Sequence, residues 1–316
     1  MTTAPAFRTD ERPARGTRPR LPHPRAVLRE QLRTTGHALR WPALVVAALV
    51  ALATLRLASR ILSRGAAVEL HDEPTALLGL VGALMPIAVW ARDERFGPGF
   101  LWTLPVDRRR HALIKVLAGW LWLMGGVALL ALWMLVLAVA SGGRVLPLET
   151  LQVLGGPAPV AGALDPAALR TVQWAPGPVI WAVPFTAATV SYLLASALAL
   201  GTRHPLRWVV GTALALPLSS IAGEVAGEQL GMSWLANAPP RALELLIESR
   251  FGLDAVLTAR TSSLDDAATL TTGQQVMVWS AVPDLADWRT ATLLWTGLGL
   301  LALWAAASRH RERRRA

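Results

Sequence analysis

The sequence has no cysteine, a single lysine and a single tyrosine among its 316 residues. Without cysteine, a disulfide framework, thiol catalysis and a cysteine-ligated metal are excluded. Charged residues are also scarce, because they make up 16 % of the chain, whereas a soluble globular domain has about a quarter. The composition therefore argues against an ordinary soluble domain.

Hydrophobic residues make up 53 % of the chain, and they are clustered into runs separated by Arg-rich or Pro/Gly-rich breaks. Apolar runs of about 20 residues match the hydrocarbon thickness of a bilayer, and in lipid such runs form helices because each backbone polar group must be satisfied within its segment. We predict an all-α integral membrane protein with about six spans, at 41–62, 74–91, 116–140, 179–201, 206–223 and 290–307. Pro86 inside the second span predicts a kink. Pro184 lies inside the fourth span, and Pro217 interrupts the fifth.

The segments outside the spans differ in character. Residues 1–22 are rich in Arg, Pro and Thr without an apolar face, and they predict a disordered cytoplasmic tail. Residues 24–40 combine apolar positions near one face with arginines at every fourth position, which predicts an amphipathic helix in the membrane interface. Of the two long segments, we expect 141–178 to be irregular and 224–289 to be partly helical, both on the outer side.

The net charge is +10, and the sequence pI is about 11.5. A basic chain can bind nucleic acid, but here the basic residues flank the hydrophobic runs, as the positive-inside rule describes. Most of the 31 Lys and Arg fall in segments that a cytoplasmic N-terminus places inside, at 1–42, 92–115, 202–207 and 308–316. Both termini are then cytoplasmic, and the preference for Arg over Lys favours a GC-rich bacterial source and thus a bacterial inner membrane.

The most informative stretch runs from Asp93 to Lys115, between the second and third predicted spans. It contains Glu-Arg, a Gly-containing turn, a short apolar cluster, a Leu-Pro-Val turn and a basic run, namely Glu94, Arg95, Gly97, Gly99, Phe100, Leu101, Trp102, Leu104, Pro105, Val106, Asp107, Arg108, Arg109 and Lys115. This segment resembles the cytoplasmic coupling loop of type-2 ATP-binding-cassette (ABC) exporter permeases. Asp107 replaces a usual Ser, which keeps a capping side chain, whereas Phe96 and Pro98 make the first turn atypical.

The resemblance implies that residues 23–316 form a permease domain whose loop contacts a separate nucleotide-binding ATPase subunit. An exposed apolar cluster with aromatic and Arg residues is itself typical of a partner surface. The alternative is that the loop lies on the inner leaflet, held by Trp102 and the basic run after Pro105.

ATP hydrolysis is not expected in this chain. A Walker A loop needs Gly-Lys followed by Ser or Thr, and the single lysine, Lys115, follows Ile114. ATP and Mg would therefore be bound by the partner, with no cofactor in this chain. Six spans make half a translocation unit, so we expect a dimer with a second copy or a sister permease, surrounded by membrane lipid.

Polar residues at membrane depth are candidates for a translocation path. Arg56, Arg60 and Arg64 form a stripe along the first span that could attract an anionic substrate, or could reach the outer headgroups. Four further residues could line a path or bond within the helix bundle: Ser191, Tyr192, Ser219 and Ser220.

Two other classes of protein remain open. An intramembrane enzyme needs His with Glu or Asp inside spans, but the six histidines fall at or beyond the predicted span ends, at His23, His37, His71, His111, His204 and His310. A receptor or scaffold that binds a ligand with its outer segments is the other alternative. We expect a non-enzymatic permease subunit, whose substrate the sequence does not identify.

Overall fold

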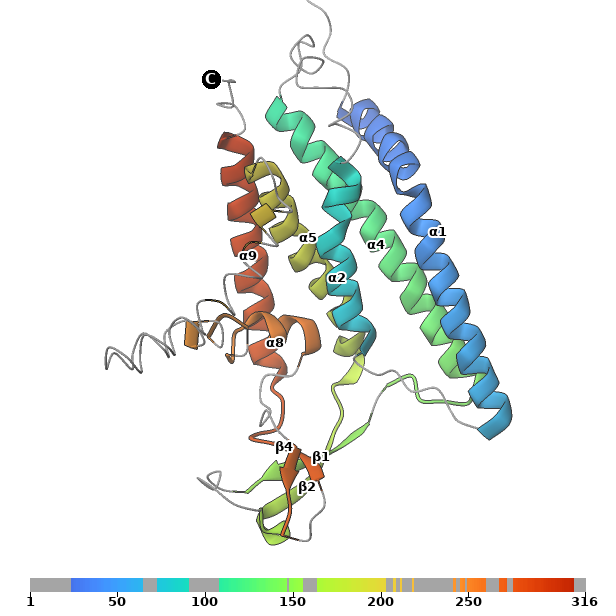
Figure 1. Cartoon of the computed structure of the whole chain (residues 1–316), viewed down its shortest axis with the longest axis vertical. Helices are drawn as coiled ribbons and strands as arrows, with labels where there is room; N and C mark the ends of the chain where they lie inside the picture. Colours follow the sequence, from blue (N-terminus) through green and yellow to red (C-terminus); the bar gives the residue numbers. More distant parts are fainter. Residues whose placement is uncertain are drawn as a thin grey trace, which may run out of the picture.

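The computed structural model describes 24–64, 73–90, 108–146, 148–155, 164–202, 207–208, 211, 218, 241–242, 245–247, 249–259, 267–271 and 275–309. Long helices run side by side through most of the molecule, and a small sheet closes one end (Figure 1). The main helices are α1 (Pro24–Arg64), α2 (Glu73–Trp90), α4 (Arg108–Ala140), α5 (Val183–Gly201) and α9 (Leu285–Arg309).

Within these described residues, four helical stretches are long and apolar enough to cross a membrane. They lie in α1, α4, α5 with the turn before it, and α9, and a shorter apolar helix covers Leu77–Trp90. The helical membrane protein predicted from composition is therefore supported. The predicted fifth span at 206–223, with Pro217, lies outside the described residues apart from isolated positions.

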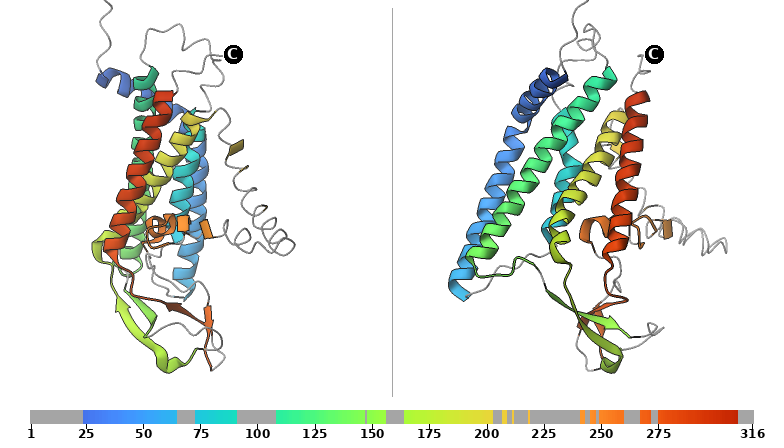
Figure 2. Two further views of the ribbon diagram at one scale, coloured as in Figure 1. Left: turned by 90° about the vertical axis from the view of Figure 1, so that its left-hand side faces the viewer. Right: turned by 180° about the vertical axis from the view of Figure 1, so that it is seen from behind.

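The first helix is longer than either segment predicted for it. The proposed interfacial helix 24–40 and the span from 41 onward form one continuous helix, α1, with Pro42 inside it. Its first part, drawn in dark blue, lies at an angle to the rest (Figure 2). Proline removes a backbone donor and bends a helix rather than always ending it.

Helix α4 begins before the third predicted span. It starts at Arg108, whereas the predicted span starts at 116, so Arg108, Arg109 and Lys115 lie on a helix and not in the loop. Arg and Lys are good helix formers, but they lower the local hydropathy, so a span defined by apolar residues omits the first turns. Pro86 lies inside α2, as predicted.

The fourth predicted span, 179–201, consists of two helical elements. A 3₁₀ helix, η3 (Gly177–Ala182), precedes α5, and Pro184 lies in the first turn of α5. Proline is tolerated there because the first backbone N–H groups of a helix have no partner within the helix.

Helix α5 is the centre of the bundle, where it packs against α2, α4 and α9. Glycine makes these contacts close. A Cβ on Gly82 of α2 would lie 2.6 Å from the carbonyl oxygen of Ala188, and one on Gly299 of α9 would lie 2.9 Å from the Cβ of Leu193. Small residues at such contacts allow helices to pack in lipid without a hydrophobic driving force.

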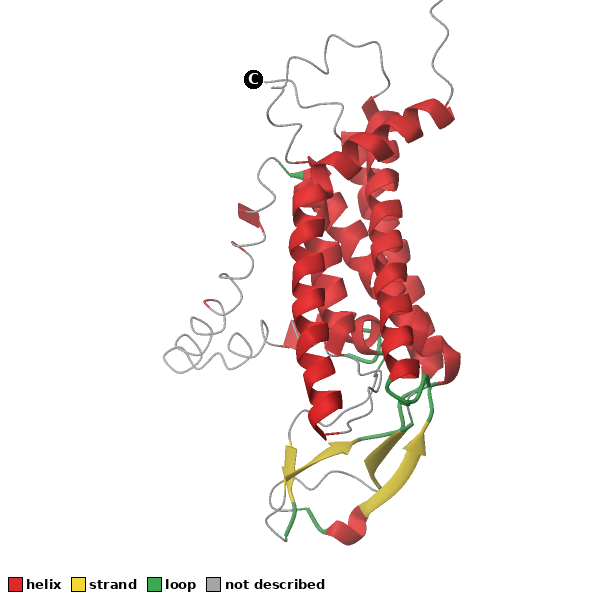
Figure 3. Cartoon of the chain, turned by 90° about the vertical axis from the view of Figure 1, so that its right-hand side faces the viewer, coloured by secondary structure: helices red, strands yellow, loops and turns green. Residues whose placement is uncertain are grey.

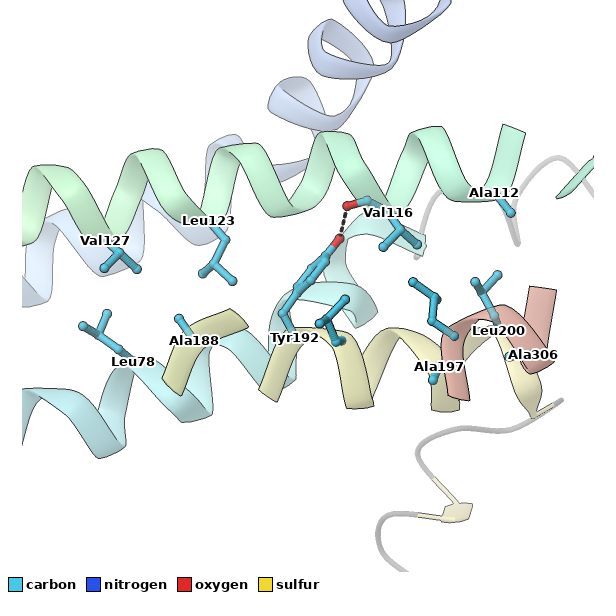
Figure 4. Packing of buried hydrophobic residues seen from close by; sticks show 12 residues of the cluster. Leu78, Ala112, Val116, Leu123, Val127, Ala188, Tyr192, Ala197, Leu200 and Ala306 are labelled. Carbon is cyan, nitrogen blue, oxygen red and sulfur yellow. Dashed lines mark hydrogen bonds between the residues drawn. The ribbon is translucent and has the colours of Figure 1, made fainter. Parts of the chain in front are cut away.

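The main core cluster joins α2, α4, α5 and α9 (Figure 4). It is filled by aliphatic side chains around one aromatic ring, namely Leu78, Ala112, Val116, Leu123, Val127, Ala188, Tyr192, Leu193, Ala197, Leu200, Leu303 and Ala306. Helix α1 lies outside this cluster and leaves large apolar side chains exposed, including Leu44, Leu49 and Leu55. Lipid is the environment in which such a surface is stable.

Indole groups attach α1 to α4. Trp122 Nε1 donates a 2.9 Å hydrogen bond to the carbonyl oxygen of Leu32, and Trp133 Nε1 donates to Thr54 Oγ1 at 3.1 Å. Gly36 packs against the Trp122 ring, since a Cβ there would lie 2.6 Å from a ring carbon.

The sheet was not predicted, and the all-α description holds only for the apolar part of the chain (Figure 3). Its strands are β1 (Glu149–Leu154), β2 (Leu169–Trp174), β3 (Ala267–Thr269) and β4 (Gln275–Trp279), in the order β2-β1-β4-β3. The pairing of β1 with β4 is parallel and joins the two segments predicted to lie outside. Contrary to expectation, 141–178 is therefore not wholly irregular, because it supplies β1 and β2.

The segment 224–289 has helical structure, as predicted, in addition to its strands. Helix α8 (Leu253–Thr258) packs against α5 and α9, with Val256 buried beside Val190 and Trp295. Trp295 Nε1 donates a 3.0 Å hydrogen bond to the carbonyl oxygen of Phe251, which fixes the chain just before α8.

Candidate functional site

The candidate site is the end of the bundle opposite the sheet, where α2 ends and α4 begins (Figure 1). The middle of the proposed coupling loop, 91–107, lies outside the described residues. That part includes Glu94, Arg95, Gly97, Phe100, Trp102, Leu104, Pro105 and Asp107. The structure describes the two helix ends that hold the loop.

Trp90 and Lys115 bring these two ends together. The Lys115 ammonium lies 4.6 Å from the centroid of the Trp90 ring, and the lysine is 7 % exposed. A cation over an indole face is attracted by the ring quadrupole, and the attraction is stronger when water is excluded. Because Trp90 is the last residue of α2, the contact joins the helices on the two sides of the loop.

The next residue after Lys115 connects α4 to α5. The Tyr192 hydroxyl donates a 2.8 Å hydrogen bond to the carbonyl oxygen of Val116 (Figure 4). Tyr192 is fully buried, so this candidate path residue points into the packed core. Ser191, beside it, is half-buried and faces α2, with its Oγ 3.4 Å from where a Cβ on Gly79 would lie.

Arg109 lies near α9 at the same end of the bundle. Its guanidinium carbon is 5.5 Å from the centroid of the Trp304 ring. Arg109 is half-buried, whereas the next arginine, Arg110, is exposed. The start of α4 therefore has contacts to α2, to α5 and to α9 within its first turns.

A groove of about 700 Å³ lies between the starts of α1 and α4. Its lining combines arginines with apolar side chains, and it consists of Arg25, Leu28, Arg109, Arg110, Leu113, Ile114 and Leu117. We call it the arginine groove. None of these seven lining residues is acidic.

The arginine stripe of the first span is only partly described. Arg56 is exposed on α1, beside a shallow hollow of about 360 Å³ lined by its neighbours on the same helix, Leu49, Leu52, Ala53 and Leu57. Arg60 and Arg64 are helical, but their side chains lie outside what is described, as do Ser219 and Ser220. Arg56 lies on α1, which packs mainly against α4 and α2, whereas Ser191 and Tyr192 lie on α5.

Among the described residues, no group of three His, Asp or Glu side chains is placed to hold a metal ion.

Comparisons with known proteins add no relative. No family model, no curated protein and no solved structure matches the chain.

Sequence patterns missed the Trp90–Lys115 contact and the arginine groove. The sequence pattern indicates an interfacial aromatic at Trp90 and a loop residue at Lys115. It does not show their contact, because the two residues lie on different helices separated by a loop. A single lysine at the start of an apolar run, after a run that ends in Trp, is the signal that could have found it.

Proposed function

We propose that this chain is the membrane-spanning subunit of an ABC-type exporter that moves a substrate across a bacterial inner membrane. The observation that supports this most is the segment 93–115, whose motif resembles a coupling loop and whose two flanking helices are held together by Trp90 and Lys115 at 4.6 Å. A loop held in this way can pass a push from a soluble partner to α2 and α4 as a unit.

The proposed transmission follows contacts at the start of α4. From the loop, motion reaches α4 and α2 together through the Trp90–Lys115 contact. From α4 it reaches α5 through the Tyr192–Val116 hydrogen bond. Helix α5 is packed closely against α2 and α9 through Gly82 and Gly299, so it moves its neighbours with it. Close packing makes such a bundle switch between discrete arrangements rather than deform gradually.

The energy source in this proposal is a separate ATPase subunit that binds ATP and Mg. The chain has no Walker A lysine, and Lys115 is buried against Trp90. A second permease copy or a sister permease, with two ATPase subunits, would complete the transporter. Both termini, rich in arginine, would then face the cytoplasm.

The translocation path remains a hypothesis. Arg56 with Arg60 offers positive charge for an anionic substrate, and Ser191 offers a hydroxyl beside Gly79. If Arg56 and Arg60 belong to a path, replacing both with Gln lowers transport while leaving assembly intact. Unchanged transport would assign them to the headgroup region instead.

Co-purification tests the proposal. Any nucleotide-binding ATPase encoded by a neighbouring reading frame is expressed with the chain, and Glu94, Arg95 and Arg108 are replaced together by Gln. We expect recovery of the ATPase to fall strongly. Arg309→Gln is the matched control, since this exposed arginine at the end of α9 lies at the same end of the bundle.

A receptor or scaffold is the second candidate, and the sheet formed by the two segments predicted to lie outside is the observation that favours it. The same experiment separates the two functions. If the triple variant retains the ATPase as well as the parent protein does, the exporter proposal fails and a ligand-binding role of the sheet becomes the better hypothesis.

A further inference from the structure

The arginine groove has the chemistry of a site for an amphiphilic anion. Three of its lining residues are arginines, at Arg25, Arg109 and Arg110, and they come from two different helices. Guanidinium groups bind phosphate oxygens through paired hydrogen bonds and are favoured wherever a phosphate is recognised. Two helices that each supply cationic groups to one groove can surround a phosphate from two sides.

The rest of the lining is apolar and continues into the surface of α4. Leu113 and Ile114 are half-buried in the groove, and Leu117 is 43 % exposed. One turn further along the same face, Leu121 is 38 % exposed. A soluble anion would leave these leucines uncovered, whereas an acyl chain would cover them while its phosphate meets the arginines.

The fold holds the groove open at a fixed place. The Trp122 indole donates to the carbonyl oxygen of Leu32, and Gly36 packs against the ring, so α1 and α4 touch there. The groove lies closer to the N-terminal ends of both helices than this contact, between the first turns of α1 and residues 109–117 of α4. Positive charge at the end of apolar helices coincides with the headgroup layer of a bilayer.

We propose that the arginine groove binds one phospholipid with an anionic headgroup, its phosphate between Arg25 and Arg110 and one acyl chain along Leu117 and Leu121. Anionic lipids are recognised by basic pockets between helices at the cytoplasmic side of membrane proteins. This site does not depend on the ATPase partner, so its test is independent of the exporter proposal.

Native mass spectrometry of the purified full chain measures the binding of phosphatidylglycerol and of phosphatidylcholine. We expect the parent protein to bind phosphatidylglycerol more tightly. In Arg25→Gln/Arg110→Gln we expect about thirtyfold weaker phosphatidylglycerol binding, equivalent to about 1 kcal/mol for each arginine near an anionic surface. Binding of phosphatidylcholine should change little.

The matched control is Arg29→Gln/Arg33→Gln, which removes the same charge from exposed positions of α1 that do not line the groove. It should bind phosphatidylglycerol as the parent protein does. Leu117→Glu provides a second variant at an exposed position, and it should weaken phosphatidylglycerol binding by placing a charge where the acyl chain lies.

Several outcomes would overturn the proposal. Equal binding of the two lipids by the parent protein would remove headgroup selectivity. Equal losses in the two arginine pairs would indicate diffuse attraction rather than a site. Competition by glycerol phosphate at concentrations similar to those of the lipid would indicate a site for a soluble anion.

Discussion

The hydroxyl of Tyr192 reaches the carbonyl oxygen of Val116 at 2.8 Å, and Gly119, one turn further along α4, leaves the space in which the hydroxyl lies. A Cβ on Gly119 would meet the Tyr192 hydroxyl oxygen directly. The only tyrosine of the chain therefore joins two helices at a point where no larger residue than glycine fits.

Gly119→Ala should destabilise the protein. The added methyl must displace the Tyr192 hydroxyl, and overpacking of this kind costs about 1–3 kcal/mol. Gly126→Ala is the matched control on the same helix, because a Cβ there has no neighbour within 4 Å. Heating in detergent followed by size-exclusion chromatography measures the difference, and equal midpoints for the two variants would contradict the contact.

Lys115 and Trp90 should be energetically coupled. A double-mutant cycle with Lys115→Met and Trp90→Leu is expected to give a coupling energy of about 1–2 kcal/mol, as for cation–π pairs shielded from water. Thermal midpoints of the parent protein, both single variants and the double variant provide the data. Additive single effects would mean that the two residues do not stabilise each other.

Gly299 and Gly297 of α9 should respond in opposite directions to alanine. Gly299→Ala places a Cβ 2.9 Å from that of Leu193 and should cost about 1–3 kcal/mol. A Cβ on Gly297 meets nothing within 4 Å, so Gly297→Ala should stabilise by up to about 1 kcal/mol through its better helix propensity. Unchanged stability in Gly299→Ala would show that α9 does not pack on α5 with this face.

A disulfide can test the pairing of β1 with β4. Gln152 and Val278 are direct partners across the parallel pair, and the absence of native cysteine leaves the introduced pair without competitors. Gln152→Cys/Val278→Cys should therefore form a bond in cells if the sheet faces an oxidising compartment. A non-reducing gel after protease cleavage between the strands reveals the link.

Gln152→Cys with Met277→Cys is the control, because neighbouring residues on a strand point to opposite faces. A link in the control alone would indicate a shifted register. A third outcome is that neither variant forms the link in cells, whereas Gln152→Cys/Val278→Cys forms it after an oxidant is added. That result would place the sheet on the cytoplasmic side and reverse the predicted orientation.

The ion pair of Arg250 with Asp287, at 2.6 Å, should stabilise the folded protein by the same amount across the usual pH range. Hydrogen bonding and attraction from Asp287 raise the pKa of Arg250 above its ordinary value. The stabilisation is therefore complete below that ordinary value and is lost only as the pH rises past the raised pKa. Between about pH 6 and 9 the small stability difference between parent and Arg250→Gln should stay constant.

Salt should reduce that difference, since the Arg250 side chain is 65 % exposed and the pair is screened. Thermal midpoints in low and high NaCl measure the effect. A difference that grows with salt would rule out an electrostatic origin.

Local patterns were sufficient for the helices. The apolar runs predicted α2 and α9 to within a few residues, and the predicted third span ends with α4 at Ala140. They did not give the start of α4, because hydropathy counts the basic residues of its first turns against an apolar span. They placed Pro184 inside a span, because a pattern alone does not separate the first turn of a helix from its middle.

Long-range pairing was beyond such patterns. Leu151 and Val153 alternate with polar neighbours, but β4, the strand that pairs with β1, follows more than a hundred residues later. Likewise, the contact of Lys115 with Trp90 depends on how α2 and α4 lie in space. The partner contact at 93–115 stays a prediction, whereas the arginine groove depends on how the starts of α1 and α4 lie in space.

The sheet has a mechanical consequence for the helices attached to it. Helix α4 leads into β1 through 141–148, β2 leads into α5 through 175–182, and β4 leads into α9 through 280–284. The β1–β4 and β1–β2 pairings thus tie three helices at one end, and those ends cannot separate without breaking a pairing. Any large opening at this end must therefore occur between this tied group and α1 or α2, which the described strands do not join.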